Sequence, residues 1–207
     1  MRRASLRLRL ALGGAAAIVA ALALAAFVLA ELFERHVTRR AVAELSVHLD
    51  QLAAGLGRDA AGAVAIVEPP ADPRFARPLS GLYWQVETAE GSVLRSRSLW
   101  DTALALPDDT LRDGAAHEHV LPGPGGTRLL VLERLVTPPP RLGLGPAREA
   151  VALDMAEIAA AERAFVRDLA PYLGLLAAVL ILAGWVQLTV GLRPLATVGA
   201  RVASVRS

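Results

Sequence analysis

Residues 171–190 (PYLGLLAAVLILAGWVQLTV) form a run of twenty residues without a charged side chain. At about 1.5 Å of rise per residue, a helix of this length reaches about 30 Å, the thickness of the hydrocarbon core of a bilayer. Tyr172 and Trp185 lie towards the two ends of the run, where amphipathic rings favour the membrane interfaces. The run therefore predicts a transmembrane helix, whose bounds we place at residues 169–192.

A second apolar run covers residues 10–30 and ends at Glu31, behind a short basic arm at residues 1–9. A cleaved signal peptide is the alternative, because small residues such as those of Ala23-Leu24-Ala25 could form a cleavage site. The apolar part of a signal peptide, however, is usually only about 7–15 residues long. The length of the run therefore favours an uncleaved transmembrane helix over residues 10–30.

The charged residues are distributed asymmetrically around these two runs. Seven of the 22 basic residues, all arginine, lie at the two ends of the chain, where no acidic residue occurs. Residues 31–168 contain all 20 acids and the other 15 arginines, a net charge of −5. Arginine-rich flanks stay in the cytoplasm, so the pattern predicts cytoplasmic termini and a middle segment on the opposite side. Since the arginine excess borders the bilayer, it indicates contact with anionic lipid rather than with nucleic acid.

Residues 31–168 carry both helix and strand patterns. An apolar stripe at helical spacing predicts a helix over residues 31–56. Residues 82–87 and 92–98 predict two strands joined by a tight turn. Asp154 and Glu157 have the spacing of a capping box and predict a last helix from Met155 towards the second span. The segment is therefore expected to be a mixed α/β domain, with a central antiparallel sheet and long N- and C-terminal helices. The stripe consists of Val37, Ala41, Leu45, Leu49, Leu52 and Leu56, and the other expected strands are residues 63–67, 116–121, 127–137 and 148–153.

The residues behind the second span resemble the start of a HAMP domain, the signal-relay linker of membrane sensor kinases and chemoreceptors. Arg193-Pro194-Leu195 follows the span, and the apolar residues Leu195, Val198, Val202 and Val205 are spaced three, four and three apart. Such a seam packs against a parallel partner helix, so the resemblance implies a homodimer. It covers only about fifteen residues, the incomplete segment 193–207. An ordinary cytoplasmic tail behind a membrane anchor is the alternative.

A second resemblance concerns the expected strand pair. The run YWQVETAEGSVLRSRSLWD is similar to the sheet centre of periplasmic sensor domains in proteobacterial histidine kinases. The two resemblances occur in the expected order and together suggest the N-terminal input half of a bacterial two-component sensor histidine kinase. This implies a PAS-like periplasmic sensor domain at residues 31–168, flanked by two transmembrane helices of the inner membrane.

The resemblance places the kinase chemistry outside these 207 residues. In such kinases a phospho-accepting histidine and an ATP-binding domain follow the HAMP domain, use ATP and Mg²⁺, and pass the phosphate to a response regulator. The chain has no P-loop, GxSxG or HExxH motif, so no catalytic residue and no cofactor are expected within it. Two alternatives stay open: the input half of a chemoreceptor or cyclic-dinucleotide enzyme, and a non-catalytic membrane-anchored regulatory module.

Four arginines are the best candidates for binding a ligand. Guanidinium groups match the geometry of carboxylate and phosphate, so Arg74, Arg77, Arg95 and Arg97 could hold an anion. Arg95 and Arg97 would lie on one face of the returning strand, because alternate residues of a strand point the same way. The alternative is a solvent-facing strand whose arginines pair with nearby acids.

Other candidate ligand residues are weaker. His117 and His119 would share a strand face and could reach one metal ion, although two ligands do not complete a site. The acidic loop residues Asp108, Asp109 and Asp113 could bind a divalent cation or face a membrane, and a plain acidic loop is the alternative. Trp84 and Trp100 are expected in the core rather than as a ligand platform. Because the chain has no cysteine, disulfides, thiolate metal sites and a cysteine nucleophile are excluded.

Overall fold

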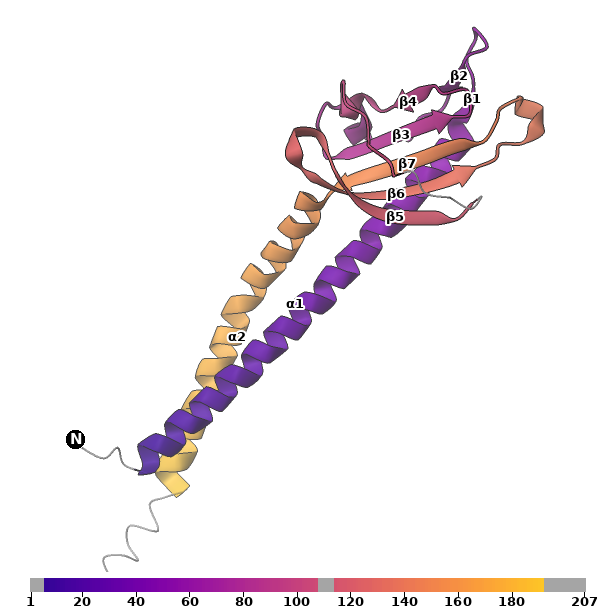
Figure 1. The fold of residues 1–207 in the computed structure, drawn as a ribbon. Helices are drawn as coiled ribbons and strands as arrows, with labels where there is room; N and C mark the ends of the chain where they lie inside the picture. The colour runs from indigo at the N-terminus through magenta and orange to yellow at the C-terminus, as the bar shows by residue number, and fades with distance from the viewer. Residues whose placement is uncertain (1–5, 108–113, 192–207) are drawn as a thin grey trace, which may run out of the picture. The chain divides into compact units, whose positions relative to one another are not determined.

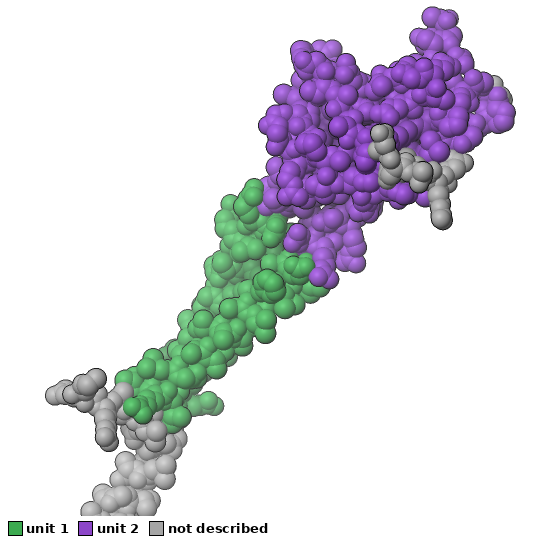
Figure 2. Space-filling model, viewed as in Figure 1, with its two compact units in different colours: residues 1–33, 162–207 green, residues 34–161 purple. Residues whose placement is uncertain are grey.

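The computed structural model describes residues 6–107 and 114–191 (Figure 1). The described residues divide into two compact units (Figure 2): those between Glu34 and Ala161, and those on either side of that segment. The helices are α1 (Leu6–Gly55) and α2 (Met155–Gly191). The strands are β1 (Leu56–Arg58), β2 (Val64–Ile66), β3 (Leu82–Thr88), β4 (Val93–Arg95), β5 (Ala116–Pro122), β6 (Arg128–Val136) and β7 (Ala147–Asp154), and the short 3₁₀ helices are η1 (Pro73–Ala76), η2 (Arg97–Leu99), η3 (Pro124–Gly126) and η4 (Pro140–Leu142).

The outer parts of α1 and α2 are the two apolar segments expected from the sequence. Both helices are long and apolar enough to cross a membrane by length and composition. Large apolar side chains remain on their surface, for example Phe27 at 68% and Leu175 at 66% exposure. Within this unit the rings of Phe33 and Phe165 stack with 4.1 Å between their centroids. Apolar surface of this kind is stable in lipid and costly in water.

The folded unit is built on a five-stranded antiparallel sheet in the order β4-β3-β7-β6-β5. The expected central antiparallel sheet between N- and C-terminal helices is thereby confirmed. The strand β7 lies in the middle, where Val151 pairs with Trp84 on one side and with Leu132 on the other. Both faces of the three central strands are covered, so β3, β6 and β7 are buried along most of their length.

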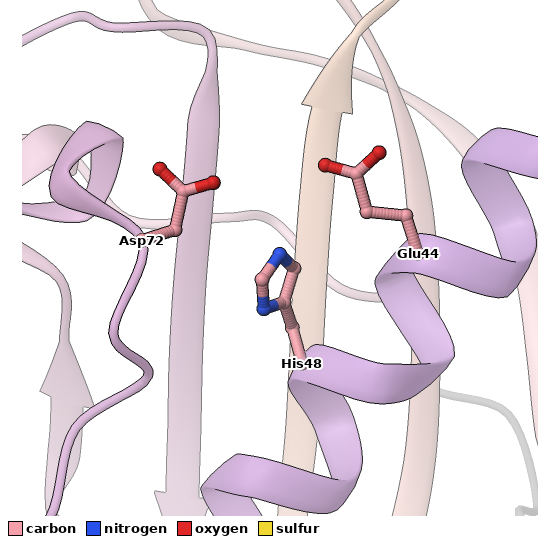
Figure 3. Close-up of side chains that lie close together, drawn as sticks. All are labelled: Glu44, His48 and Asp72. Atoms are coloured by element: carbon pink, nitrogen blue, oxygen red, sulfur yellow. The ribbon is translucent and has the colours of Figure 1, made fainter.

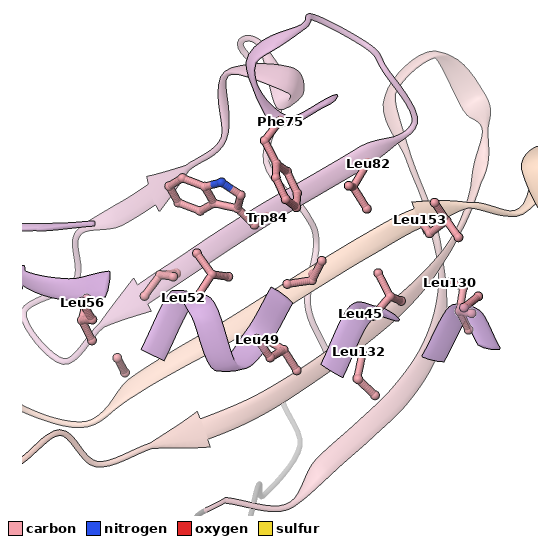
Figure 4. Close-up of a cluster of buried hydrophobic side chains, with 14 of the residues drawn as sticks. Leu45, Leu49, Leu52, Leu56, Phe75, Leu82, Trp84, Leu130, Leu132 and Leu153 are labelled. Carbon is pink, nitrogen blue, oxygen red and sulfur yellow. The ribbon is translucent and has the colours of Figure 1, made fainter. Parts of the chain in front are cut away.

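The C-terminal part of α1 packs on one face of the sheet (Figure 4). The expected apolar stripe provides the contact, because Leu45, Leu49 and Leu52 are almost completely buried. Each such leucine contributes about 1.5–3 kcal/mol of transfer free energy. The sheet side of this inner core consists of Leu82, Trp84, Val86, Leu130, Leu132, Ala147, Val151 and Leu153, and the opposite face is covered with Leu99 and Leu104 over Tyr83, Leu129, Val131, Ala150 and Ala152.

The returning strand of the central hairpin is shorter than predicted. The strand β4 ends at Arg95, and residues 97–99 form η2, so Arg95 and Arg97 do not share a strand face. Serine side chains explain the break, because they take over ladder hydrogen bonds with β3. Ser96 Oγ accepts the backbone N–H of Trp84 at 3.0 Å, and Ser98 Oγ donates to the carbonyl of Leu82 at 2.7 Å. The prediction of a strand through Ser98 was wrong for this reason.

Two further expectations changed at the helix ends. Residues 56–58 form β1, paired with β2, whereas the sequence predicted only the end of a helix there. A Cβ on Gly55 would collide with the carbonyl oxygen of Glu68, so the close approach of the two strands requires glycine. At the start of α2, Asp154 Oδ1 accepts the N–H of Ala156 as a helix cap, but the Asp154 N–H donates to Gly81, so the capping box is not closed.

Candidate functional site

One cluster of charged side chains in the folded unit is organised around Arg74. Asp72 caps η1: its Oδ1 accepts the backbone N–H of Arg74 at 2.8 Å, and Pro73 supplies the first residue of the turn. This cap fixes the chain direction at a proline-rich loop and orients the side chain of Arg74. The local sequence Asp72-Pro73-Arg74-Phe75 thus anchors Phe75 in the core and turns the guanidinium towards the two helices.

The guanidinium of Arg74 forms ion pairs with three carboxylates from three different elements. Nη2 lies 2.8 Å from Asp72 Oδ2 and 2.6 Å from Glu44 Oε1 of α1, and Nη1 lies 3.3 Å from Glu157 Oε2 in the first turn of α2. One cation therefore joins the helix that opens the domain to the helix that closes it. We refer to Arg74, Glu44, Asp72 and Glu157 as the Arg74 cluster.

The electrostatics of the Arg74 cluster follow from this arrangement. Hydrogen bonding to Asp72 raises the pKa of Arg74 still further, so the guanidinium stays charged. The same hydrogen bond lowers the pKa of Asp72 below its ordinary value. Burial raises the pKa of Glu157, although the charge of Arg74 opposes that effect. The cluster carries three carboxylates and one guanidinium, a formal excess of negative charge next to a helix start.

His48 lies one helical turn after Glu44 and faces the same cluster (Figure 3). Only 8% of the residue is exposed, and its ring packs edge-on against Phe75. Its Nδ1 lies 3.1 Å from Gln51 Oε1, while its Nε2 is buried without a hydrogen-bond partner among the described residues. Ligand atoms of Glu44, His48 and Asp72 all lie within 4.8 Å of one another.

A hollow of about 320 Å³ opens beside η1. Its lining is largely apolar and includes Pro70, Phe75 and Trp84, with Asp72 and the exposed Arg97 among its polar residues. An apolar recess with a few polar groups is the usual form of a small-molecule site. The hollow and the Arg74 cluster share Asp72, so both depend on the same loop.

The four arginines expected to bind an anion have different environments. Arg74 is held by the three carboxylates described above. Arg95 donates to the carbonyls of Thr102 at 3.0 Å and Asp101 at 3.4 Å. Arg77 is exposed, and Arg97 lines the hollow. An anion site formed by these arginines stays a prediction, and Arg74 already has carboxylates as its anionic partners.

His117 and His119 lie on one face of β5, as expected, with 6.5 Å between their ring centroids. His119 Nε2 lies 2.9 Å from Glu133 Oε1, and the fully buried Glu133 also accepts from Arg148 at 2.8 Å. This nitrogen is therefore engaged in a buried polar network across β5, β6 and β7. Metal binding by the two histidines stays a prediction.

Other candidates lie outside the described residues or in unexpected places. Trp84 is in the core as predicted, but the prediction was wrong for Trp100, which is 58% exposed and adopts a positive φ of 58° at the end of η2. The acidic loop candidates Asp108, Asp109 and Asp113 and the relay candidates Arg193, Pro194, Leu195, Val198, Val202 and Val205 lie outside the described residues.

Sequence reasoning missed Glu44, His48, Asp72 and Glu157 as parts of a site. One local signal existed, since Glu44 and His48 are four residues apart on a predicted helix and must share a face. Their connection to Asp72 and Glu157 requires the tertiary fold. Comparison of the chain with models of known families, with curated proteins and with solved structures finds no match.

Proposed function

We propose that the chain senses a signal outside the cytoplasm and relays it through the membrane by two helices. One observation carries the proposal: α1 and α2 contain the two membrane-length apolar segments, and the same helices open and close the folded domain. A change inside the domain that displaces one helix relative to the other would therefore act directly on a membrane segment. The Arg74 cluster supports this role, because it joins α1 to the start of α2.

In this proposal the domain is a PAS-like periplasmic sensor on an inner-membrane protein with both termini in the cytoplasm. The chain is the input part of a two-component sensor histidine kinase and works as a homodimer. Arg193-Pro194-Leu195 and the following seam would begin the HAMP relay. Autophosphorylation with ATP and Mg²⁺ and transfer to a response regulator would belong to a kinase part beyond residue 207.

The mechanism is a shift between two populated states of the helix pair. A ligand that binds one state better changes their ratio by its difference in affinity for the two states. Each carboxylate of the Arg74 cluster comes from a different element. A ligand that breaks one of the ion pairs with Arg74 would therefore free the loop, α1 or α2 to move relative to the other two. The apolar segments would transmit the resulting piston, tilt or rotation.

Topology can be tested first, since the chain has no cysteine and single-cysteine variants need no background changes. We expect Glu90→Cys, in an exposed turn, to react with a membrane-impermeant maleimide in intact spheroplasts. Ser5→Cys should react only after the membrane is permeabilised. Labelling of both positions, or of Ser5→Cys alone, in intact spheroplasts would contradict the proposed topology.

Signal relay can be tested with a hybrid receptor that joins residues 1–192 to the complete HAMP and kinase parts of a characterised sensor kinase. We expect Arg74→Ala to shift the basal output of the hybrid, because it removes the shared partner of Glu44 and Glu157. Arg77→Ala is the matched control, since Arg77 is exposed three residues away. Equal output of a membrane-inserted wild type and Arg74→Ala would count against relay through this cluster.

A further inference from the structure

We propose that Glu44, His48 and Asp72 bind a divalent transition-metal ion, with Zn²⁺ the best fit, in competition with Arg74. The three side chains offer one imidazole nitrogen and two carboxylate oxygens within 4.8 Å of one another. Ligands about 2.0–2.2 Å from one zinc ion lie about 3.3–3.6 Å apart in a tetrahedron. Small rotations of the two carboxylates would close this difference, and Glu44 has the freedom to move because it is exposed.

The imidazole of His48 is already oriented as a metal ligand. The amide oxygen of Gln51 can only accept a hydrogen bond, so Nδ1 carries the proton of the neutral ring, and in that form Nε2 presents a lone pair. Figure 3 shows Nε2 directed between the carboxylates of Glu44 and Asp72. Ligating histidines usually donate their other ring N–H to an oxygen acceptor in this way. A buried acceptor without a partner is costly, and a metal ion would satisfy it.

The charge of the Arg74 cluster favours a dication. Glu44, Asp72 and Glu157 carry three negative charges against the single positive charge of Arg74, a formal total of −2. A divalent cation neutralises this excess. The ion would take Glu44 and Asp72 from the guanidinium, while Arg74 could keep its contact with Glu157 on α2.

The ligand set also selects among cations. Imidazole nitrogen suits zinc, copper and nickel, whereas Mg²⁺ and Ca²⁺ prefer sites made entirely of oxygen. Three protein ligands leave a fourth position of a tetrahedral ion for water. Such a site exchanges its ion more readily than a closed four-ligand site, which suits a sensor better than a structural element.

A consequence for signalling rests on the proposed function. Metal binding would join α1 to Asp72 of the loop and release Glu44 from Arg74, so that α1 loses its link through Arg74 to Glu157 of α2. The binding step itself needs no signalling, so the two ideas can fail independently. We therefore measure binding on the purified chain and response in the hybrid receptor.

The binding experiment is isothermal titration of ZnCl₂ into the full chain in detergent, purified without a histidine tag. We expect one Zn²⁺ per chain and at least a tenfold loss of affinity in both His48→Gln and Glu44→Gln. Arg74→Gln should bind at least tenfold more tightly than the wild type, because the competing cation is gone. His36→Gln is the control and should bind as the wild type does, and His119→Gln tests the rival pair of histidines on β5.

Several outcomes would overturn the proposal. Absence of Zn²⁺ binding up to millimolar concentration is one, and unchanged affinity in folded His48→Gln is another. Loss of binding in His119→Gln instead would assign the ion to His117 and His119. If His48→Gln does not fold by circular dichroism, Glu44→Gln and Arg74→Gln decide the matter through their opposite expected effects. A hybrid receptor that ignores Zn²⁺ while the chain binds it would reject only the signalling consequence.

Discussion

The two faces of the sheet each bury one glutamate, and the two side chains have opposite surroundings. Glu133 on β6 and Glu149 on β7 are both fully buried. Glu133 faces away from α1, and both its oxygens are engaged, one with His119 and one with Arg148. Glu149 faces α1, where its Oε1 has no partner among the described residues and its Oε2 meets only Arg134, at 3.4 Å. Removal of a fully paired buried carboxylate leaves its partner charge uncompensated, whereas removal of an incompletely paired one relieves a desolvation cost. The two substitutions should therefore have opposite effects on stability.

The difference has a structural reason. The face with Glu133 is covered by the segment after η2. The carbonyl of Pro107 in this segment accepts a hydrogen bond from Arg148, so the covering segment supplies a polar group to the network around Glu133. The face with Glu149 is covered by the apolar stripe of α1. Arg134 divides its charge there between Glu149 and Asp50 of α1, to which it lies closer, at 2.7 Å. Glu149 is therefore the less compensated charge and lies directly beneath the helix proposed to relay the signal.

Loss of Glu133 should have the largest effect. We expect Glu133→Gln to destabilise the chain by about 3–5 kcal/mol, because it removes the buried carboxylate 2.8 Å from the guanidinium of Arg148, whose contact with Glu87 is longer, at 3.9 Å. Urea denaturation in detergent, followed by tryptophan fluorescence, to which the buried Trp84 contributes, measures the change. Glu118→Gln on the exposed side of β5 is the control and should change stability by less than about 0.5 kcal/mol. If Glu133→Gln and Glu118→Gln changed the stability equally, the pairing of Glu133 would contribute nothing, and the proposed difference between the two faces of the sheet would be wrong.

Loss of Glu149 should have the opposite sign. Burial raises its pKa from 4.5 to about 7, so the folded state holds the proton more tightly than the unfolded chain. The stabilisation that this proton provides is complete below about pH 4.5 and is lost as the pH rises through about 7. We expect Glu149→Gln to match the wild type near pH 4.5 and to exceed it by up to about 3 kcal/mol at pH 8.

Denaturation of wild type and Glu149→Gln at several pH values would test this prediction, since the difference between the two cancels the titration of all other groups. A difference that does not change between pH 4.5 and 8 would mean that Glu149 titrates normally. A variant less stable than the wild type at pH 8 would mean that the ion pair with Arg134 outweighs desolvation, and the two faces would then be alike.

Removal of Arg74 should cost less than removal of Glu133. Its guanidinium is partly solvated, so we expect Arg74→Gln to lower stability by about 1–2 kcal/mol, chiefly through the bonds to Asp72 and Glu44. Arg74 lowers the pKa of Asp72. The loss of stability in Arg74→Gln should therefore be complete at a pH above the ordinary pKa of aspartate, and it should decrease as the pH falls towards the lowered pKa of Asp72. Denaturation of Arg74→Gln and of the control Arg77→Gln at pH 7 and pH 3 measures this. A loss as large at pH 3 as at pH 7 would indicate a packing role for Arg74.

These features differ in how far the sequence predicts them. The contact of Leu45, Leu49 and Leu52 with the sheet follows from helical spacing, and the hairpin of β3 and β4 follows from a local turn. Both signals involve neighbours along the chain. The strand β1 is formed by pairing with β2, which the local sequence does not show. Gly55 and Gly57 therefore predicted only the end of the helix.

The charged clusters were beyond the reach of such patterns. Arg74 is 30 residues from Glu44 and 83 from Glu157, and no local spacing connects them. Glu133 and Glu149 lie on strands whose two faces are both covered, by segments far apart in sequence. Alternation along a strand indicates which residues share a face, but it does not indicate which face is exposed to solvent. The partners of a buried charge are therefore known only from the tertiary structure.

The smallest expected effect tests the link between Glu149 and α1. Asp50 is mostly exposed, so Asp50→Asn should cost no more than about 0.5–1 kcal/mol at neutral pH. Its negative charge, however, raises the pKa of Glu149 and holds the guanidinium of Arg134. We expect Asp50→Asn to lower the pH at which Glu149 loses its proton. The measurement compares the stability of Asp50→Asn with that of the double variant Asp50→Asn/Glu149→Gln at several pH values. The pH at which this difference changes should be lower than in the same comparison without Asp50→Asn. An unchanged pH dependence would show that α1 contributes desolvation alone. A shift to lower pH would mean that a charge on the surface of α1 controls a buried charge in the sheet, and that movement of the helix would change the protonation of Glu149.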